Sequence, residues 1–303
     1  MGGERKETRR RVEASYRARG VLGDRQGRRG FAEHPPRLEA VGQRVLEDLR
    51  RYGIAITSFD ELVGDAGLWQ RLAADMREFA ERIEAEGAAT DTPQEKTDYL
   101  VWRNRSAAGG NAFTLPGDDP WVRYAVDTPI HDVVNAYRER WTKLSNVDQW
   151  YTRPFSGQTL RVASQRWHRD PEDRHVVKVF TYFSHVDEGA GPFEYLTETK
   201  PGSRYGDAYP WKPFGKKYRT PEELAEKVPA DQHKRLTGSP GTVILAETSG
   251  FHRGGFAKDK PRLLSVQTYI SAAALESGLA RRWYSIDGEP VNGHEAPARY
   301  ALT

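Results

Sequence analysis

The feature that most restricts how this chain can fold is the short stretch Ser164–Asp170, Ser-Gln-Arg-Trp-His-Arg-Asp. Its His168 and Asp170 stand two residues apart. On an extended strand alternate side chains share a face, so we expect both to project into the same space. One imidazole and one carboxylate placed in this way are two of the three ligands of a facial site made by two His and one carboxylate. A third ligand must then come from another part of the chain.

His252 is the best candidate for that third ligand. It follows an apolar segment that begins at Gly241, and it precedes the turn Arg-Gly-Gly. Ten residues later Arg262 opens another apolar segment, so its side chain could return across a hairpin toward the metal. Each of the other histidines is expected to be structural or exposed, because none has a partner at ligand spacing.

Strand patterns dominate the chain from Ser145 onward. We predict strands near 146–152, 159–167, 175–186, 192–196, 241–247 and 262–271, with short pieces near 236 and 251. About eight short strands separated by turns favour a double-stranded β-helix, or jelly roll, in which inward-facing residues surround one cavity. Such a core explains how His252 could meet His168 from 84 positions away.

The part that precedes the strands is mostly helical. Apolar residues at helical spacing predict a helix that ends at Gly53 and a second one that carries Leu68 to Ile83. Asp119-Pro120 and Thr128-Pro129 each predict a helix start. The fold class is therefore mostly β with flanking helices. We expect a single domain over 37–303, with a helical buttress at 37–143, a jelly-roll core at 144–272 and a C-terminal extension at 273–303.

Composition sets further limits. Residues 1–36 contain ten Lys and Arg against five Asp and Glu, which is typical of a flexible Arg-rich leader. No motif supports nucleic-acid binding by this leader. The chain has no cysteine, which excludes disulfides and thiolate metal ligands and agrees with a cytoplasmic location. With no apolar run of eighteen residues, we expect neither secretion nor a membrane span.

Residues 197–235 form a basic, aromatic insertion between strands. It fits either of two interpretations. It could be a lid over an anionic substrate, or an ordinary solvated loop whose aromatic residues pack on the barrel. Thr220-Pro-Glu-Glu223 predicts a capping box that opens a short helix within it.

The order of these motifs resembles the iron(II)/2-oxoglutarate-dependent oxygenases, and most closely their phytanoyl-CoA dioxygenase-like branch. The resemblance is carried by Gln165–Asp170, Val177–Phe183, Asp187–Tyr195, His252 and Arg262. It implies that His168, Asp170 and His252 bind iron(II) and that Arg262 grips the far carboxylate of 2-oxoglutarate. Gln165 and Lys178 are further candidates for binding the cosubstrate.

The resemblance also implies a reaction. Molecular oxygen and 2-oxoglutarate are consumed, succinate and carbon dioxide are released, and a small-molecule substrate is oxidised, usually by hydroxylation. Because halogenating relatives have a small residue in place of the carboxylate, Asp170 disfavours halogenation. Desaturation, ring closure and epimerisation use the same ligands. We expect a natural-product or metabolite hydroxylase.

Two alternatives come from other classes of function. One is a jelly-roll binding module without catalysis, in which the three ligands are only structural polar groups. The other is a 2-oxoglutarate oxygenase that acts on nucleic acid, which the Arg-rich leader suggests. Adding iron(II) and 2-oxoglutarate without oxygen separates enzyme from binding module, because only the enzyme should give a visible charge-transfer band.

Overall fold

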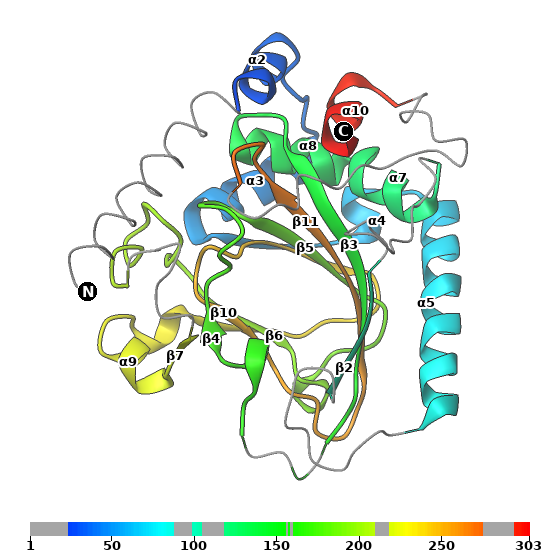
Figure 1. Ribbon diagram of the computed structural model, residues 1–303, viewed down its shortest axis with the longest axis vertical. Coiled ribbons are helices and arrows are strands. Elements are labelled where there is room, and N and C mark those ends of the chain that lie inside the picture. Colours follow the sequence, from blue (N-terminus) through cyan, green and yellow to red (C-terminus); the bar gives the residue numbers. More distant parts are fainter. Residues whose placement is uncertain are drawn as a thin grey trace, which may run out of the picture.

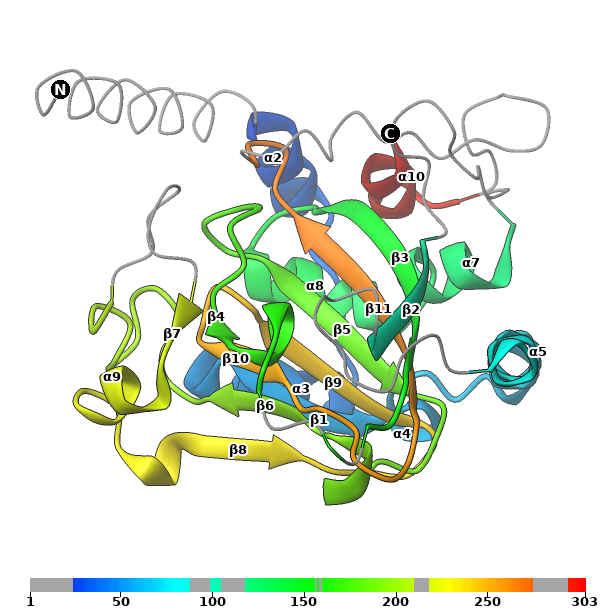
Figure 2. The ribbon, with the colours of Figure 1, turned by 60° about the horizontal axis from the view of Figure 1, so that its bottom comes forward.

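The computed structural model describes residues 24–87, 99–104, 118–155, 157, 160–209, 218–274 and 294–303. Two antiparallel sheets face each other across an interior, and helices cover the outside of one of them (Figures 1 and 2). The prediction of a mostly β protein with flanking helices and a jelly-roll core is therefore confirmed. Within the described part of the chain, no helix is both long and apolar enough to cross a membrane.

The larger sheet, which we call the major sheet, has the strand order β1-β9-β5-β11-β3-β2. Its strands are β1 (Ile54–Ser58), β2 (Leu100–Asn104), β3 (Lys143–Thr152), β5 (Val177–Tyr182), β9 (Thr242–Glu247) and β11 (Arg262–Ile270). In the central strands apolar side chains occupy both faces. On β9, for example, Val243 and Leu245 belong to the core beneath the helices, whereas Ile244 and Ala246 face the other sheet. Apolar residues at every position are typical of a strand buried on both sides.

The smaller sheet, which we call the minor sheet, has the order β7-β4-β10-β6-β8. Its strands are short: β4 (Trp167–His168), β6 (Phe193–Leu196), β7 (Tyr218–Arg219), β8 (His233–Leu236) and β10 (His252–Gly254). The strand predicted over 159–167 is wrong for most of its length. Ala163 has a positive φ of 44° and opens the 3₁₀ turn η1 (Ala163–Gln165), which the Gln165 side chain closes by accepting the N–H of Val162.

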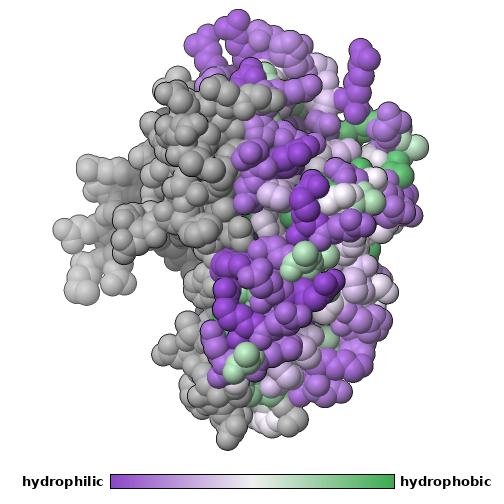
Figure 3. Space-filling view, turned by 90° about the vertical axis from the view of Figure 1, so that its right-hand side faces the viewer, coloured by the Kyte–Doolittle hydropathy of each residue, from purple (hydrophilic) through white to green (hydrophobic). Residues whose placement is uncertain are grey.

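Helices pack on the outer face of the major sheet (Figure 1). They are α3 (Ala40–Tyr52), α4 (Phe59–Leu62), α5 (Ala66–Glu86), α7 (Pro120–Val126) and α8 (Pro129–Arg138). The predicted ends agree with the structure: Gly53 ends α3 in the left-handed region, and Asp119 accepts the N–H of Trp121 at the start of α7. On the side of the molecule that carries α5, the visible surface is mostly hydrophilic (Figure 3).

Part of the predicted leader forms a helix, α2 (Arg25–Glu33), which the sequence analysis did not predict. The helix approaches Trp141 closely, because an added Cβ at Gly30 would overlap the indole ring. Asp24, just before the helix, is fully buried and pairs with Arg140. These contacts are made by a glycine and a single carboxylate. The helix therefore has no apolar stripe from which it could have been predicted. Residues 1–23 lie outside the described part of the chain.

Within the insertion at 197–235, the structure describes residues 197–209 and 218–235. Helix α9 (Pro221–Ala225) begins at the capping box predicted from Thr220 and Glu223. Tyr205 and Tyr209 pack against a small core cluster that includes Trp167. The remaining basic and aromatic residues at 210–217, on which the lid interpretation partly depends, lie outside the described residues. Beyond residue 274, the structure describes helix α10 (Ala296–Leu302).

Candidate functional site

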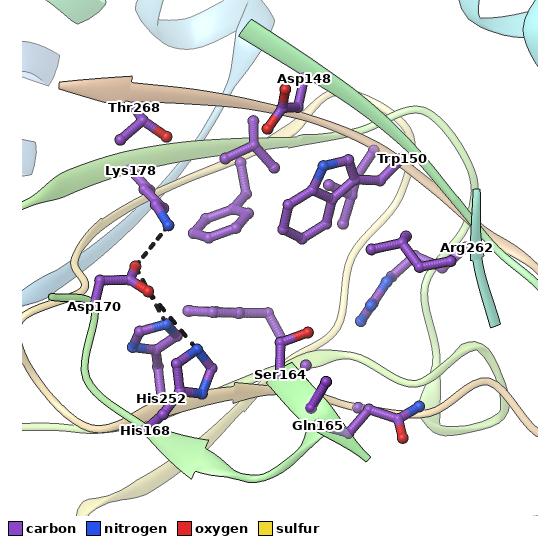
Figure 4. Close-up of a pocket in the computed structure, with 18 of the residues that line it drawn as sticks. Asp148, Trp150, Ser164, Gln165, His168, Asp170, Lys178, His252, Arg262 and Thr268 are labelled. Atoms are coloured by element: carbon purple, nitrogen blue, oxygen red, sulfur yellow. Dashed lines mark ion pairs between the residues drawn. The ribbon is translucent and has the colours of Figure 1, made fainter. Parts of the chain in front are cut away.

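A cavity of about 500 Å³ lies between the two sheets. Its wall on the major sheet is made by alternate residues of β3, β5 and β11, because alternate side chains of a strand share a face. The members of this wall that matter below are Asp148, Trp150, Lys178, Phe180, Arg262 and Thr268. His168, Asp170 and His252 lie on the opposite wall, and Arg262 lies across the cavity from them (Figure 4).

The three predicted ligands meet in this cavity. Strand β10 pairs with β4 so that His252 stands opposite His168, and the two ring centroids are 4.3 Å apart. Oδ1 of Asp170 is 3.7 Å from Nε2 of His168, and Oδ2 is 3.6 Å from Nε2 of His252. One ligand atom from each residue can be chosen so that all lie within 4.8 Å of one another. Among the described residues this is the one cluster of His and carboxylate side chains with metal-binding geometry.

Asp170 reaches the site by a different local structure from the one predicted. Strand β4 ends at His168, so the two residues do not share a strand. Instead the backbone N–H of Asp170 donates to the carbonyl of Thr248, 2.9 Å away, just after β9. Both side chains reach the cavity, but Asp170 is held by a turn residue that follows a strand of the major sheet.

Backbone contacts fix the orientation of both imidazoles. Nδ1 of His168 donates to the carbonyl of Arg166 at 2.8 Å, and Nδ1 of His252 donates to the carbonyl of Gly250 at 3.0 Å. Because a carbonyl only accepts, each Nδ1 carries the proton and each Nε2 presents a lone pair toward Asp170. Such a second hydrogen bond is the usual way in which a metal-binding histidine is held in the correct tautomer.

The protonation states also suit a metal. Burial, with a contribution from His252, lowers the pKa of His168 to about 3. Burial likewise lowers the pKa of His252, so both rings are neutral near pH 7. For Asp170 burial alone would raise the pKa, but Lys178 and the two histidines outweigh it and hold the pKa below its usual value. Two neutral imidazoles and one carboxylate, all buried, fit a divalent transition metal such as iron(II).

Lys178 is in direct contact with a predicted ligand. Its Nζ lies 2.7 Å from Oδ2 of Asp170 and 3.6 Å from Oε1 of Glu172. Burial alone would lower the pKa of Lys178, but the two carboxylates outweigh it and raise the pKa, so the side chain is an ammonium ion. Gln165, the other predicted cosubstrate residue, lines the cavity and uses its amide oxygen to close the η1 turn.

Arg262 is a buried cation at the far end of the cavity (Figure 4). Its guanidinium donates to the carbonyl of Gly191 and to Oγ1 of Thr152, and burial lowers its pKa. In the part of the chain that the structure describes, no carboxylate forms an ion pair with it, and its Nε has no hydrogen-bond partner. A buried guanidinium without a carboxylate is costly, so this position favours an anionic ligand.

Several cavity residues were missed by the sequence analysis. Tyr99 and Ser164 both line the cavity and share a hydrogen bond of 3.0 Å. Trp150 and Asp148 lie within a predicted strand, and alternation along it shows that they share a face, but only the packing of the two sheets shows that this face meets the cavity. A short strand was predicted at 99–103, close to the observed β2, but the place of Tyr99 in the cavity depends on the pairing of β2 with β3.

Of the six other histidines, four have structural partners and two, His34 and His185, are exposed. His175 contacts Glu247 at 2.5 Å, His233 contacts Glu194 at 2.6 Å and His294 contacts Asp127 at 2.6 Å. His131 is buried against the backbone carbonyl of Val126. None of these belongs to the cluster around Asp170.

Comparison with known proteins agrees with the fold. No family model and no curated protein matches the sequence. Among solved structures, the chain is similar to the epimerase SnoN in complex with Fe3+, alpha ketoglutarate and nogalamycin RO. The TM-score is 0.51 at 15% identity, covering 84% of this chain and 93% of SnoN.

Two further structures resemble the chain to the same degree. The non-heme alpha ketoglutarate dependent carbocyclase SnoK from nogalamycin biosynthesis gives a TM-score of 0.50 at 13% identity, covering 85% of this chain and 95% of SnoK. AviO1 from Streptomyces viridochromogenes gives a TM-score of 0.51 at 17% identity, covering 79% of this chain and 99% of AviO1. At such identities the likeness establishes a shared fold. The phytanoyl-CoA dioxygenase-like branch stays a prediction.

Proposed function

We propose that this protein is an iron(II)/2-oxoglutarate-dependent oxygenase that hydroxylates a small molecule. The observation that carries the proposal is the shape of the cavity. One end of the cavity presents two neutral imidazoles and a carboxylate, and the other end presents the buried cation Arg262. A cosubstrate with an anionic group at each end could contact the metal and Arg262 at the same time.

Each residue has a definite task under this proposal. His168, Asp170 and His252 would hold iron(II) through Nε2, a carboxylate oxygen and Nε2. Bound iron(II) with 2-oxoglutarate and oxygen would supply the oxidising chemistry, with succinate and carbon dioxide as products. Arg262 would bind the distal carboxylate of 2-oxoglutarate with charge-assisted hydrogen bonds, and its own contacts with Gly191 and Thr152 would keep the guanidinium in place.

The remaining wall supports the same chemistry. Trp150, Phe180 and Phe193 line the cavity with apolar surface, which limits the water that reaches the reacting groups. Asp148 and Thr268 add polar groups at the end of the cavity nearer Lys178 (Figure 4). A substrate there would meet both apolar and hydrogen-bonding side chains, which suits a small, polar organic molecule.

We propose hydroxylation because it is the usual outcome with these ligands, and because Asp170 occupies the position that a halide would need. The named activities of SnoN and SnoK are epimerisation and carbocyclisation. Product analysis must therefore accompany any assay. A substrate from natural-product or metabolite biosynthesis and a cytoplasmic location are parts of the proposal.

The first test uses His252→Ala. Wild-type protein with iron(II) and 2-oxoglutarate under anaerobic conditions should give a visible charge-transfer band, and with oxygen it should form succinate. The variant should lose the band and at least about 100-fold of succinate formation, because a first ligand matters at least as much as its outer partners. His185→Ala, which removes an exposed histidine, should behave as wild type. A band of full strength in His252→Ala would refute the ligand assignment.

A second test addresses Arg262. Arg262→Met should leave metal binding unchanged and raise the KM for 2-oxoglutarate about 30-fold or more, since losing one partner of a buried charge pair costs about 2 kcal/mol or more. Titration of the charge-transfer band with 2-oxoglutarate measures the same loss without turnover. An unchanged affinity for 2-oxoglutarate would show that the anion binds elsewhere.

A further inference from the structure

Lys178 occupies an unusual position for a lysine. It lies in the middle of the major sheet on β5, and its side chain is only 14% exposed. The next inward-facing residues of the same strand, Phe180 and Tyr182, belong to the apolar core between the sheets. Lys178 is therefore the one charged residue of β5, and its ammonium is directed at Asp170 (Figure 4).

Stability alone does not explain this contact. A buried ion pair gains little over an apolar pair of similar size, because both charges must leave water. The ammonium also lies close to the position where a dication would bind, which works against metal affinity. Lys178 therefore costs desolvation energy and also weakens metal binding. We expect its contribution to lie in the orientation of Asp170.

We infer that Lys178 is a positioning residue that keeps Asp170 a one-oxygen ligand. Each carboxylate oxygen of Asp170 lies near one ligand nitrogen, Oδ1 at 3.7 Å from Nε2 of His168 and Oδ2 at 3.6 Å from Nε2 of His252. Only Oδ2 is also paired with the ammonium, at 2.7 Å, which leaves Oδ1 as the oxygen that can bind a metal. A carboxylate that bound the metal through both oxygens would occupy a further coordination position. If each of the three protein ligands gave one atom, a bound metal would keep open positions for a chelating keto acid and for oxygen. Holding Oδ2 therefore keeps room for the cosubstrate.

The sequence suggested a direct contact with the cosubstrate for Lys178, and the inference gives this residue a different role. The ammonium lies on the Asp170 side of the cavity, and Arg262 lies at the other end (Figure 4). The far carboxylate of a cosubstrate held by Arg262 would therefore be remote from Lys178. The inference rests on the proposed function, since it assumes a metal and a chelating cosubstrate.

The decisive experiment compares Lys178→Met with wild type in two anaerobic titrations. Binding of manganese(II) is measured by calorimetry, and binding of 2-oxoglutarate to the iron(II) protein is measured by the charge-transfer band. We expect manganese affinity to change by less than about tenfold, because two effects oppose each other. The Asp170 carboxylate loses its fixed orientation, which weakens binding, and the repulsion between the Lys178 ammonium and the metal disappears, which strengthens it. We expect 2-oxoglutarate affinity to fall about tenfold or more, because a second carboxylate oxygen of Asp170 would compete for a position that the keto acid needs. Lys178→Arg, which keeps a cation, should recover most of the loss.

Lys143→Met is the matched control. Lys143 is a half-buried lysine of β3 whose Nζ donates to the carbonyl of Tyr300 at 2.7 Å, far from the ligands in the fold. Its replacement should leave both titrations unchanged. If Lys178→Met does not fold, Lys178→Gln tests the same expectation, because a shorter neutral amide also releases Oδ2.

The stability of the metal-free protein gives an independent readout. Without its ammonium partner Asp170 should destabilise Lys178→Met, and saturating manganese(II) should reduce the deficit in melting temperature relative to wild type. Unchanged 2-oxoglutarate affinity in Lys178→Met would overturn the inference while the proposed function stands. Wild-type protein that binds neither manganese(II) nor 2-oxoglutarate would overturn the proposed function itself.

Discussion

The major and minor sheets are held together in different ways. Strands of the major sheet are five to ten residues long, and apolar side chains cover both faces of its central strands. Strands of the minor sheet are two to four residues long, and they carry both histidine ligands. The ladder of hydrogen bonds in such short strands cannot by itself set their register.

Charged and aromatic contacts on the outer face of the minor sheet help to fix the register of its short strands. Glu194 of β6 is 4% exposed, and it accepts from Arg253 of β10 at 2.6 Å and from Arg161 at 3.1 Å. His233 of β8 contacts the same carboxylate at 2.6 Å. The Arg253 guanidinium in turn lies 4.4 Å from the ring centre of Trp167 on β4. We call these five residues the Glu194 cluster.

The difference shows how the site is divided between the sheets. The Glu194 cluster joins four of the five minor-sheet strands, and two of its members, Arg253 and Trp167, directly adjoin His252 and His168. The register of the ligands therefore depends on a few ionic contacts. The major sheet, by contrast, supplies a rigid apolar wall that carries Arg262 and Lys178.

The largest effect should follow from Glu194→Gln. The substitution leaves Arg253 and Arg161 without their carboxylate, and removing one partner of a buried ion pair costs about 3 to 5 kcal/mol in the free energy of unfolding. Metal affinity should also fall about tenfold, because the ligand-bearing strands lose their common anchor. Urea denaturation and manganese(II) calorimetry measure the two effects.

Glu61→Gln is the control for this substitution. Glu61 forms an exposed pair with Arg44 at 3.4 Å, and its loss should cost under about 1 kcal/mol. If Glu194→Gln kept wild-type metal affinity, the Glu194 cluster would be important for folding but not for the site.

Removing an apolar side chain from the core beneath the major sheet should lower stability without lowering metal affinity. Leu245 is fully buried on the helix side of β9, so Leu245→Ala should cost about 2 to 5 kcal/mol. Manganese affinity of the folded variant should nevertheless match wild type, because this side chain points away from the ligands. Leu160→Ala, at a residue 77% exposed, should change stability by about 0.5 kcal/mol at most. Weaker metal binding in Leu245→Ala would break the distinction between the sheets.

The smallest effect concerns pH. Burial lowers the pKa of His131 to about 4, against about 6.5 in the unfolded chain. Between these values the unfolded chain binds the proton and the folded protein does not, so stability falls as the pH drops below about 6.5. From pH 7.5 to pH 5, His131 should account for about 2 kcal/mol, at 1.36 kcal/mol per pH unit. His131→Gln should remove that part of the pH dependence, as measured by urea denaturation at both pH values.

His185→Gln, at an exposed histidine, should retain the wild-type pH dependence.

Glu194 contributes to the pH dependence of stability at lower pH than His131 does. Burial alone would raise its pKa, but His233 and Arg253 outweigh it and lower the pKa to about 2. Its stabilisation is therefore present above about pH 4.5 and is lost as the pH falls toward 2. Identical pH curves for wild type and His131→Gln would show that His131 is not the source of the earlier loss.

Much of the fold could be predicted from local pattern. The strands at 146–152, 241–247 and 262–271 were found because β-branched, aromatic and other apolar residues recur along them. The helix starts at Asp119 and Thr128 were found because capping residues precede proline. The strand predicted at 159–167 failed because a turn at Ala163 interrupts it. Helix α2 was missed because a close approach at Gly30, and not an apolar stripe, holds it.

For the site, the sequence by itself determined which residue types are available: a His-x-Asp pair, a later His that ends an apolar strand, and an Arg ten residues beyond. These patterns are local, and short-range geometry limits what each can do. Only the tertiary structure decided which partners they meet. Asp170 is placed by the backbone of Thr248, Lys178 pairs with Asp170, and Glu194 joins strands that are far apart in sequence. Such contacts depend on the packing of two sheets against each other, and no spacing along the chain encodes the distance between side chains on different sheets.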